Sequence, residues 1–363
     1  MTAGGEAPCA AAGAEGILAL LPEELAGALA PLGAQPRAAK QIFRWLHGRL
    51  VRDFAAMTDL PAALRSELAG KFRIQPPQAV KRERSSDGTE KLLLRYADCA
   101  QVETVFLTDG PRVTQCVSTQ VGCALGCLFC ATGALGFARS LEASEIVSEV
   151  EDFGPGNSPR PLSSRNVVFM GMGEPLLNYD AVLRAVRVLN HPDGLKVGAR
   201  RITVSTAGIP EGIRRLAAEP LQVRLAVSLN ATTDELRSRL MPVNKKHPLG
   251  ELLSALRHYR TSSGRRPTLE YVLLGGVNDS AGDLARLTSI ARETAAHVNL
   301  IEFNPLPGSP PAAFKAPAKG LAVRWKRSLA DGGVECAIRF RRGLDIAAGC
   351  GQLAGGGLAE RTP

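Results

Sequence analysis

The chain has 363 residues, of which 45% are hydrophobic and 22% charged, the composition of an ordinary folded protein with about two domains. It contains no run of about 18 apolar residues that would cross a bilayer, and it begins without the basic stretch and apolar core of a secretory signal, so we expect a cytoplasmic protein without membrane contact. The net charge of +9 and the pI near 9.3 suggest a polyanionic partner such as RNA or DNA, although a basic surface is often only a solvated one.

The first part of the chain is predicted to contain a disordered start and a small helical domain. Residues 1–20 begin with an Ala- and Gly-rich stretch that has little to bury, so we expect disorder there. Residues 21–75 contain three helical segments that open with Pro22, Pro36 and Pro61, each suited to the first turn of a helix. We predict that these segments form an accessory domain that binds RNA.

The second of these helical segments carries a short basic stripe. Arg37, Lys40 and Arg44 recur at helical spacing, on the face opposite the apolar residues Ile42 and Phe43. The stripe fits two interpretations, either a solvated helix face or a set of contacts with RNA phosphates.

Residues 76–110 are predicted to form a β extension of short antiparallel strands, with a turn at Ser86-Asp87-Gly88-Thr89. Strands and helices then alternate up to residue 354, and residues 355–363 are expected to form a flexible tail. The strands are predicted at residues 112–119, 165–170, 201–205, 223–229, 268–274, 297–303 and 334–340. The helices are predicted at residues 143–152, 179–190, 210–218, 233–259, 281–294 and 319–331.

This alternation predicts an α/β fold with a parallel sheet over residues 111–354. About six strand-helix units suggest an open, partial TIM-like barrel, (β/α)6, in place of the closed barrel of eight units. In such a barrel the chemistry takes place at the carboxyl ends of the strands.

Three cysteines follow the first predicted barrel strand with the spacing C-x3-C-x2-C: Cys123, Cys127 and Cys130. A structural zinc site needs four ligands, and no fourth Cys or His lies nearby, since the next histidine is His191. Three thiolates suit three corners of a [4Fe–4S] cluster whose fourth iron stays open. The pattern resembles that of the radical S-adenosylmethionine (SAM) enzymes, in which the open iron binds SAM and one electron cleaves it to a 5'-deoxyadenosyl radical. Buried core thiols or a partial zinc knuckle are the alternative interpretation.

Small polar residues and glycines follow the later barrel strands, where they would meet at one rim. Glycine lets the backbone approach a ligand closely, and a carboxylate can meet the ammonium group of SAM. The candidate SAM-binding residues are Gly173, Glu174, Ser205, Ser228, Leu229, Asn230 and Asn304.

Several longer motifs resemble the RlmN/Cfr family of radical SAM RNA methyltransferases, and the resemblance covers residues from about 20 to 354. Its most specific motif is the Cys-Gly-Gln-Leu that begins at Cys350. The other motifs are the cysteine stretch, Gly-Met-Gly-Glu-Pro-Leu-Leu-Asn at residues 171–178, Arg201-Ile-Thr-Val-Ser-Thr, Arg239-Leu-Met-Pro-Val-Asn-Lys-Lys and Leu269-Glu-Tyr-Val-Leu-Leu.

The resemblance implies methylation at C2 of an adenosine in 23S rRNA and of the adenosine 3' of the anticodon in some tRNAs. It implies one [4Fe–4S] cluster and two SAM molecules per turnover. It also implies roles for three residues: Cys350 carries the transferred methyl group, Cys116 releases the product by forming a disulfide with Cys350, and Glu103 accepts the proton from C2. The implied partners are these RNAs and an electron donor such as flavodoxin, and the protein is expected to be a monomer.

Two alternatives stay open at the level of sequence: methylation at adenine C8, as in the antibiotic-resistance branch of the family, and a zinc-stabilised RNA-binding protein without catalysis. One position departs from the family pattern, because Asn230 stands where many members carry His. A side-chain role in SAM binding at Asn230 is therefore in doubt. Cys99 and Cys336 match no motif and are interpreted as structural.

Overall fold

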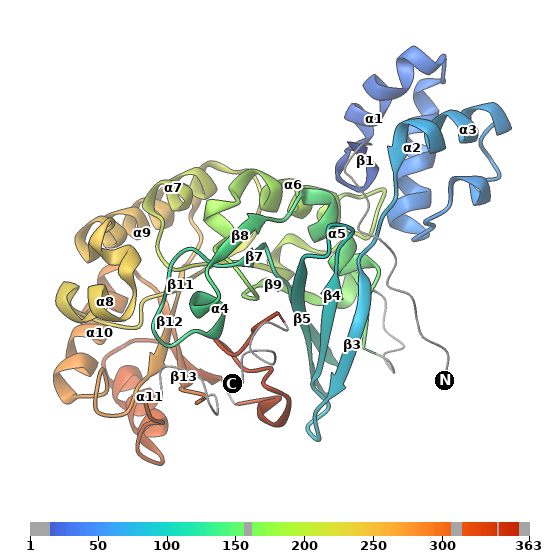
Figure 1. Cartoon of the computed structure of the whole chain (residues 1–363). Coiled ribbons are helices and arrows are strands. Elements are labelled where there is room, and N and C mark those ends of the chain that lie inside the picture. Colours follow the sequence, from blue (N-terminus) through green and yellow to red (C-terminus); the bar gives the residue numbers. More distant parts are fainter. Residues whose placement is uncertain (1–14, 156–161, 306–313, 340, 356–363) are drawn as a thin grey trace, which may run out of the picture.

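The computed structural model describes residues 15–155, 162–305, 314–339 and 341–355. Ten strands form one sheet in the order β14-β13-β12-β11-β10-β9-β6-β5-β4-β3 (Figure 1). The strands from β6 to β14 pair in parallel, and β3 to β6 pair antiparallel. Within the described residues β14 and β3 are the two free edges, which confirms the predicted open barrel.

The parallel strands lie where the sequence predicts them, because their apolar runs are bounded by turn residues. Their bounds are β6 Arg112–Cys116, β9 Asn166–Phe169, β10 Ile202–Thr206, β11 Arg224–Ser228, β12 Thr268–Leu273, β13 His297–Glu302 and β14 Cys336–Arg339. The central residues of β9, β11, β12 and β13 are mostly buried, as expected for a parallel sheet covered by helices, whereas those of the edge strand β14 are half-buried.

The barrel helices cover the outer face of the curved sheet (Figure 1). Their bounds are α5 Ala143–Glu151, α6 Tyr179–Asn190, α7 Pro210–Ala218, α8 Asp234–Leu240, α9 Leu249–Ser263, α10 Ala281–Glu293 and α11 Leu321–Asp331. The prediction of a single helix over residues 233–259 is wrong, because the structure has two helices there, α8 and α9. Pro242 starts a short 3-10 turn and Pro248 caps α9, because proline lacks the N–H that a continuous helix needs.

Three strands continue the sheet beyond β6, and we call them the β-extension: β3 Gln78–Arg84, β4 Glu90–Arg95 and β5 Gln101–Asp109. The predicted turn at Ser86-Asp87-Gly88-Thr89 joins β3 to β4, where the Asp87 carboxylate accepts a hydrogen bond from the Thr89 N–H at 2.9 Å. In Figure 1 the β-extension stands beside the mouth of the barrel and faces the end of the chain.

The N-terminal helices α1 Pro22–Leu29, α2 Pro36–Phe43 and α3 Ala62–Lys71 lie apart from the barrel, above α5 and the β-extension (Figure 1). The predicted disorder over residues 1–20 is wrong for its last part, and residues 1–14 lie outside the described residues. β1 Glu15–Gly16 pairs in parallel with β2 Phe72–Arg73, and Ile17 is fully buried, because apolar side chains here pack against the barrel.

A buried ionic cluster joins the N-terminal helices to α5. His47 and Glu151 are bonded at 2.8 Å between Nδ1 and Oε1, and both side chains are fully buried. Arg52 completes the cluster, at 2.8 Å from Glu151 and 2.6 Å from Asp152. Burial raises the pKa of Asp152, and the Arg52 guanidinium opposes this effect.

No helix within the described residues is long and apolar enough to span a membrane.

We predict that Arg52→Met lowers the free energy of unfolding by about 3 to 5 kcal/mol, because it leaves the Glu151 carboxylate buried without its guanidinium partner. Urea denaturation followed by circular dichroism measures the change. The matched control is Arg44→Met, which removes the exposed ion pair with Asp193 and is expected to cost less than about 1 kcal/mol. Equal losses in the two variants would contradict a special role for the buried cluster.

Candidate active site

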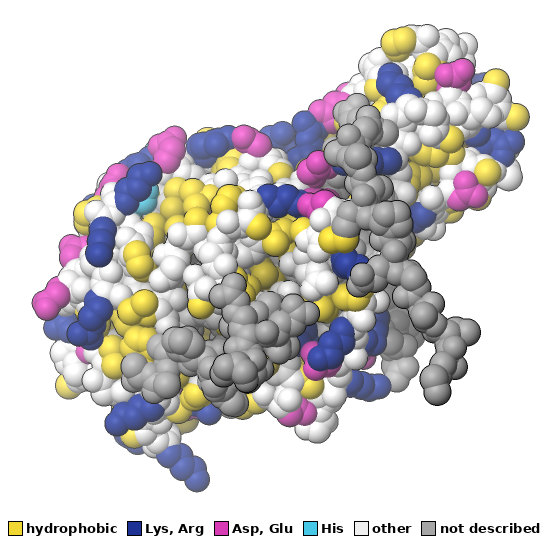
Figure 2. Space-filling model, viewed as in Figure 1, with side chains coloured by type: hydrophobic (Ala, Val, Ile, Leu, Met, Phe, Trp, Pro, Cys, Tyr) yellow, Lys and Arg dark blue, Asp and Glu magenta, His cyan; other side chains and the backbone are white. Residues whose placement is uncertain are grey.

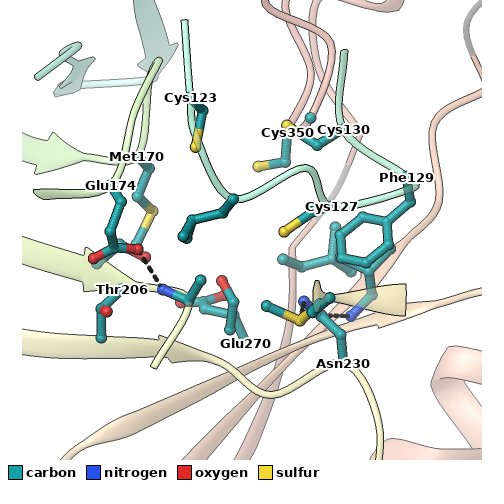
Figure 3. A pocket seen from close by; sticks show the side chains of 18 of the residues that line it. Cys123, Cys127, Phe129, Cys130, Met170, Glu174, Thr206, Asn230, Glu270 and Cys350 are labelled. Carbon is teal, nitrogen blue, oxygen red and sulfur yellow. Dashed lines mark hydrogen bonds between the residues drawn. The ribbon is translucent and has the colours of Figure 1, made fainter. Parts of the chain in front are cut away.

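A cavity of about 170 Å³ lies at the carboxyl ends of the barrel strands, where the fold predicts chemistry. Its wall combines residues from the loop after β6, from the strand ends and from the end of the chain. The described lining residues with polar, sulfur or ring groups include Cys123, Cys127, Phe129, Cys130, Met170, Glu174, Ser205, Thr206, Ser228, Asn230, Glu270, Arg339 and Cys350 (Figure 3).

The three predicted cluster cysteines all line this cavity, on the loop between β7 Gln120–Gly122 and α4 Ala131–Ala134. Backbone hydrogen bonds hold the loop, from the Cys123 N–H to the Gly136 carbonyl at 2.7 Å and from the Leu128 N–H to the Leu240 carbonyl at 3.0 Å. Burial raises the pKa of the Cys123 thiol to about 11 and raises that of Cys127 further.

The donor chemistry of this loop fits a [4Fe–4S] cluster. Half-buried thiols need a nearby cation to ionise, and coordination to iron supplies that charge. Within the described part of the chain, no three Cys, His, Asp or Glu side chains converge on one point as a single metal ion requires. A cubane cluster instead spreads its thiolates over separate irons. The three cysteines would each hold one iron and leave the fourth open toward the cavity.

Gly173 and Glu174 lie at the end of β9 and face the same cavity. Gly173 has a φ of +96°, and a Cβ at this position would meet the Gln120 side chain at 2.5 Å, so glycine is required. The buried Glu174 carboxylate accepts hydrogen bonds from the N–H groups of Leu176 at 3.0 Å and Ala207 at 2.7 Å (Figure 3). Burial raises the pKa of Glu174, and the Ala207 hydrogen bond opposes this shift.

Ser205 and Ser228, at the ends of β10 and β11, both line the cavity and are half-buried. The guanidinium of the fully buried Arg237 holds these strand ends in place. It donates to the carbonyls of Ala207 at 2.5 Å, of Ser228 at 3.2 Å and of Leu229 at 3.1 Å. Burial lowers the pKa of Arg237 to about 10. Arg237 thus holds the strand ends at the cavity in place, and the sequence did not indicate this role.

Asn230 lines the cavity, but its side chain is largely engaged within the protein. Its Oδ1 accepts from the Val272 N–H at 2.9 Å, and its Nδ2 lies 3.4 Å from the Met241 sulfur. The φ of +55° is in the left-handed region, where asparagine is better tolerated than most residues. The main contact of the Asn230 side chain is therefore its hydrogen bond with the backbone of β12.

Two predicted SAM-binding residues, Leu229 and Asn304, are not among the described residues that line the cavity. Leu229 is fully buried because its apolar side chain packs in the core. Asn304 lies behind the rim, where its amide nitrogen would be 2.6 Å from a Cβ at Gly349. Both residues therefore stay predictions as SAM-binding residues, and Asn304 lies against the segment that carries Cys350.

Sequence reasoning missed an ion pair in the wall of the cavity. Arg339 at the end of β14 donates to Glu270 of β12 at 2.9 Å, and Glu270 also accepts from the Asn299 side chain at 2.9 Å. Both charged residues interrupt otherwise apolar strands, which is the signal in the sequence that could have revealed them.

Cys350 reaches the cavity from the end of the chain because its segment is bonded to the cluster loop. The Ala131 N–H donates to the Gly351 carbonyl at 2.7 Å, and the Thr132 hydroxyl donates to the Leu353 carbonyl, also at 2.7 Å. Gly351 has a φ of +81° and lies against the backbone of Phe129. Figure 3 shows Cys350 beside Cys130, with its thiol at the cavity.

Cys116, the last residue of β6, lies close to Cys350. Burial raises the pKa of the Cys116 thiol, and the neighbouring Cys350 and Glu149 side chains raise it further. Glu149 is fully buried behind it and accepts from the Ser118 N–H at 3.0 Å, and burial raises the pKa of Glu149 to about 8. Both thiols are free in the structure.

Glu103 lies on β5 of the β-extension, outside the described lining of the cavity. It is 5% exposed, and it accepts hydrogen bonds from the N–H groups of Ala354 at 2.6 Å and Gly355 at 3.2 Å. The structure thus places Glu103 against the segment that carries Cys350.

Comparisons with known proteins agree with this geometry. A family model described as the Radical SAM superfamily matches residues 117–288, and one described as the ribosomal RNA large subunit methyltransferase N-terminal domain matches residues 16–74. The chain is 48% identical over 345 residues to the dual-specificity RNA methyltransferase RlmN of Anaeromyxobacter dehalogenans, covering 93% of this chain and 91% of that protein.

Two further relatives agree. The chain is 46% identical over 341 residues to a probable dual-specificity RNA methyltransferase RlmN of Thermus thermophilus, covering 93% of this chain and 92% of that protein. A radical SAM methyltransferase from Sphaerobacter thermophilus has a crystal structure that matches with a TM-score of 0.88 at 44% identity, covering 94% of this chain and 99% of that one. The chain therefore belongs to the RlmN family of radical SAM RNA methyltransferases.

Proposed function

We propose that this protein methylates C2 of an adenosine in 23S rRNA and of the adenosine 3' of the anticodon in some tRNAs. The observation that carries the proposal is that Cys350 lines the same cavity as Cys123, Cys127 and Cys130, with Cys116 close by. A methyl-carrying cysteine and a cluster site in one cavity fit methyl transfer through a protein-bound carbon. The relatives named as dual-specificity RNA methyltransferases support RNA as the substrate.

The chain's residues divide the binding of SAM between them. Cys123, Cys127 and Cys130 hold the cluster, and Glu174 and the backbone at Gly173 receive the methionine part of SAM beside it. Ser205 and Ser228 offer hydroxyls at the adjacent strand ends, while Asn230 contributes mainly by shaping the backbone. When bound, the cluster and SAM supply a one-electron cleavage that removes a hydrogen atom from carbon.

Cys350 and Cys116 act in sequence on the transferred carbon. Cys350 sulfur first accepts a methyl group from one SAM and loses its own proton. After a hydrogen atom is removed from that methyl group, its carbon bonds to C2 of adenine, and C2 then gives up its proton and one electron, which the oxidised cluster would take back. The Cys116 thiolate next forms a bond to the Cys350 sulfur, the electron pair of the sulfur–carbon bond stays with the carbon, which takes up a proton, and the product leaves as a disulfide forms. Glu103, which lies against the segment that carries Cys350, accepts the C2 proton.

The RNA is held by a surface that extends beyond the cavity. Figure 2 shows lysine and arginine side chains, with acidic ones among them, on the N-terminal helices, along the outer helices of the barrel and on the β-extension. We propose that residues 21–75 form the accessory domain that binds RNA, that residues 76–110 form the β extension and that residues 111–354 form the catalytic barrel. We further propose a cytoplasmic monomer that receives electrons from a donor such as flavodoxin.

Mass spectrometry of digested rRNA and tRNA, from cells with and without this gene, tests the function. The expected result is 2-methyladenosine that disappears with the gene. Methylation at C8 would assign the protein to the antibiotic-resistance branch, and no change at either carbon would overturn the proposal.

Replacing Cys123, Cys127 or Cys130 by Ala is expected to abolish iron binding and SAM cleavage together, because each thiolate holds one iron of the cluster. Iron analysis and the yield of 5'-deoxyadenosine under reducing, anaerobic conditions measure the two effects. Cys336→Ala is the control, since this half-buried cysteine lies on β14 outside the described lining of the cavity. Normal SAM cleavage in any of the three variants would refute the assignment.

The two reactive cysteines are expected to fail in different ways when each is replaced by Ala. Cys350→Ala has no sulfur to carry the methyl group, so neither adduct nor product forms. Cys116→Ala still forms the carbon bond to adenine but cannot release it, so the RNA stays attached at residue 350. Mass spectrometry of the nuclease-treated peptide decides the matter, and an adduct in the Cys350 variant would reverse the two roles.

The basic stripe on α2 is expected to contact RNA through Arg37 and Lys40, which are exposed, whereas Arg44 is bonded to Asp193 at 2.7 Å. Neutralising Arg37 and Lys40 with Gln should weaken RNA binding and reduce the slope of log affinity against log salt by about one per lost phosphate contact. The slope of an Arg44→Gln variant should change less. An unchanged slope in the double variant would show that the stripe is only a solvated helix face without RNA contacts.

A further inference from the structure

The segment that carries Cys350 rests on the β-extension over residues 341–355 (Figure 1). Arg342 donates to the Thr108 carbonyl at 2.7 Å and pairs with Asp109 at 2.9 Å. The Gly343 N–H donates to the Asp87 carboxylate at 2.8 Å. The beginning of the segment is therefore fixed to the turns of the β-extension.

Lys91 of β4 lies at the centre of this contact. Its ammonium nitrogen is 3.0 Å from Glu103 Oε1, 3.5 Å from Glu83 Oε2 and 3.4 Å from the Ala347 carbonyl. Lys91 is only 8% exposed, which is unusual for lysine and requires paired charges. One buried ammonium group thus contacts both the Glu103 carboxylate and the Cys350 segment.

The second oxygen of Glu103 contacts the other end of the same segment, at Ala354 and Gly355. Together Lys91 and Glu103 hold residues 347–355 at both ends, with Cys350 between them. Ala347 adopts a φ of +50°, a left-handed conformation that a non-glycine residue keeps only when its surroundings impose it. The contact from Lys91 to the Ala347 carbonyl is one such constraint.

Lys91 is the one cation that pairs with Glu103 among the described residues. An opposite charge beside a nearly buried carboxylate offsets part of the cost of removing that carboxylate from water. The same ammonium also fixes the direction of the carboxylate, since a proton acceptor must lie within hydrogen-bond reach of the proton that it takes.

We propose that Lys91 is a positioning residue for the methyl transfer, acting through Glu103 and through the Cys350 segment. It holds the proton acceptor and the methyl-carrying cysteine in one arrangement on the β-extension. The proposal rests on the proposed function for the role of Glu103, but its structural part concerns only contacts within this chain.

The first experiment follows amide hydrogen exchange in the cluster-free protein, in the peptide that covers residues 341–355. Lys91→Met is expected to speed exchange at Ala354 and Gly355 about tenfold, the factor that corresponds to about 1.4 kcal/mol. Lys91→Arg should keep most of the protection. Lys81→Met is the matched control, because Lys81 pairs with Glu83 and is bonded neither to Glu103 nor to the segment.

The second experiment measures the single-turnover rate of RNA methylation in the loaded enzyme. Lys91→Met should slow the reaction about 10- to 100-fold, as for other residues that orient a reacting group. Lys91→Arg should restore most of the rate, because it keeps a positive charge beside Glu103.

The outcomes separate this inference from the proposed function. Unchanged exchange in Lys91→Met overturns the inference, and so does faster exchange with an unchanged methylation rate, which is the result of a merely structural lysine. If Lys91→Met does not fold, Lys91→Gln takes its place in both experiments. A wild-type enzyme that leaves RNA unmethylated overturns the proposed function, while the exchange result still decides whether Lys91 holds the segment.

Discussion

The hydrogen bond from the Ala131 N–H to the Gly351 carbonyl joins two parts of the chain that are far apart in sequence. It brings the end of the chain against the cysteine loop of the first barrel unit. Closing so long a loop costs conformational entropy, which the contacts along the segment must outweigh. The open barrel makes the contact geometrically available, since a closed barrel would leave no side for the end of the chain to enter.

The β-extension provides most of the remaining contacts of that segment. By continuing the sheet past β6, it adds a wall that a six-unit barrel would lack, and this wall bears Lys91 and Glu103. The catalytic cavity is therefore built from three separate stretches of sequence: the cysteine loop, the strand ends of the barrel, and a segment at the end of the chain. Each stretch is held by hydrogen bonds to one of the others.

The sequence predicts the barrel well because local signals determine its elements. Apolar runs bounded by Gly, Pro and polar residues locate the strands and most of the helices, and the cysteine spacing locates the cluster loop. The break between α8 and α9 was also a local signal, in Pro242 and Pro248, but the apolar periodicity on either side concealed it. Residues 15–20 were misjudged because Ile17 and Leu18 are buried only through tertiary packing.

The ionic contacts could not be predicted in the same way. The pairs Arg339–Glu270 and Lys91–Glu103 join residues on different strands, and their meeting depends on strand order and register rather than on spacing along the chain. Leu229 illustrates the converse case, since its place in a strand-end motif suggested a ligand contact, while its side chain points into the core.

The parallel pairing of β1 with β2 brings the two ends of the N-terminal helical region together, at residues 15–16 and 72–73. A segment whose ends meet at one point behaves as an insert that can be exchanged as a block without re-routing the rest of the chain. Evolution can thus alter the N-terminal helices separately from the barrel, provided that the exchanged block keeps partners for the charges buried on α5. The helices that we propose to bind RNA and the barrel are in this sense separable parts of one polypeptide.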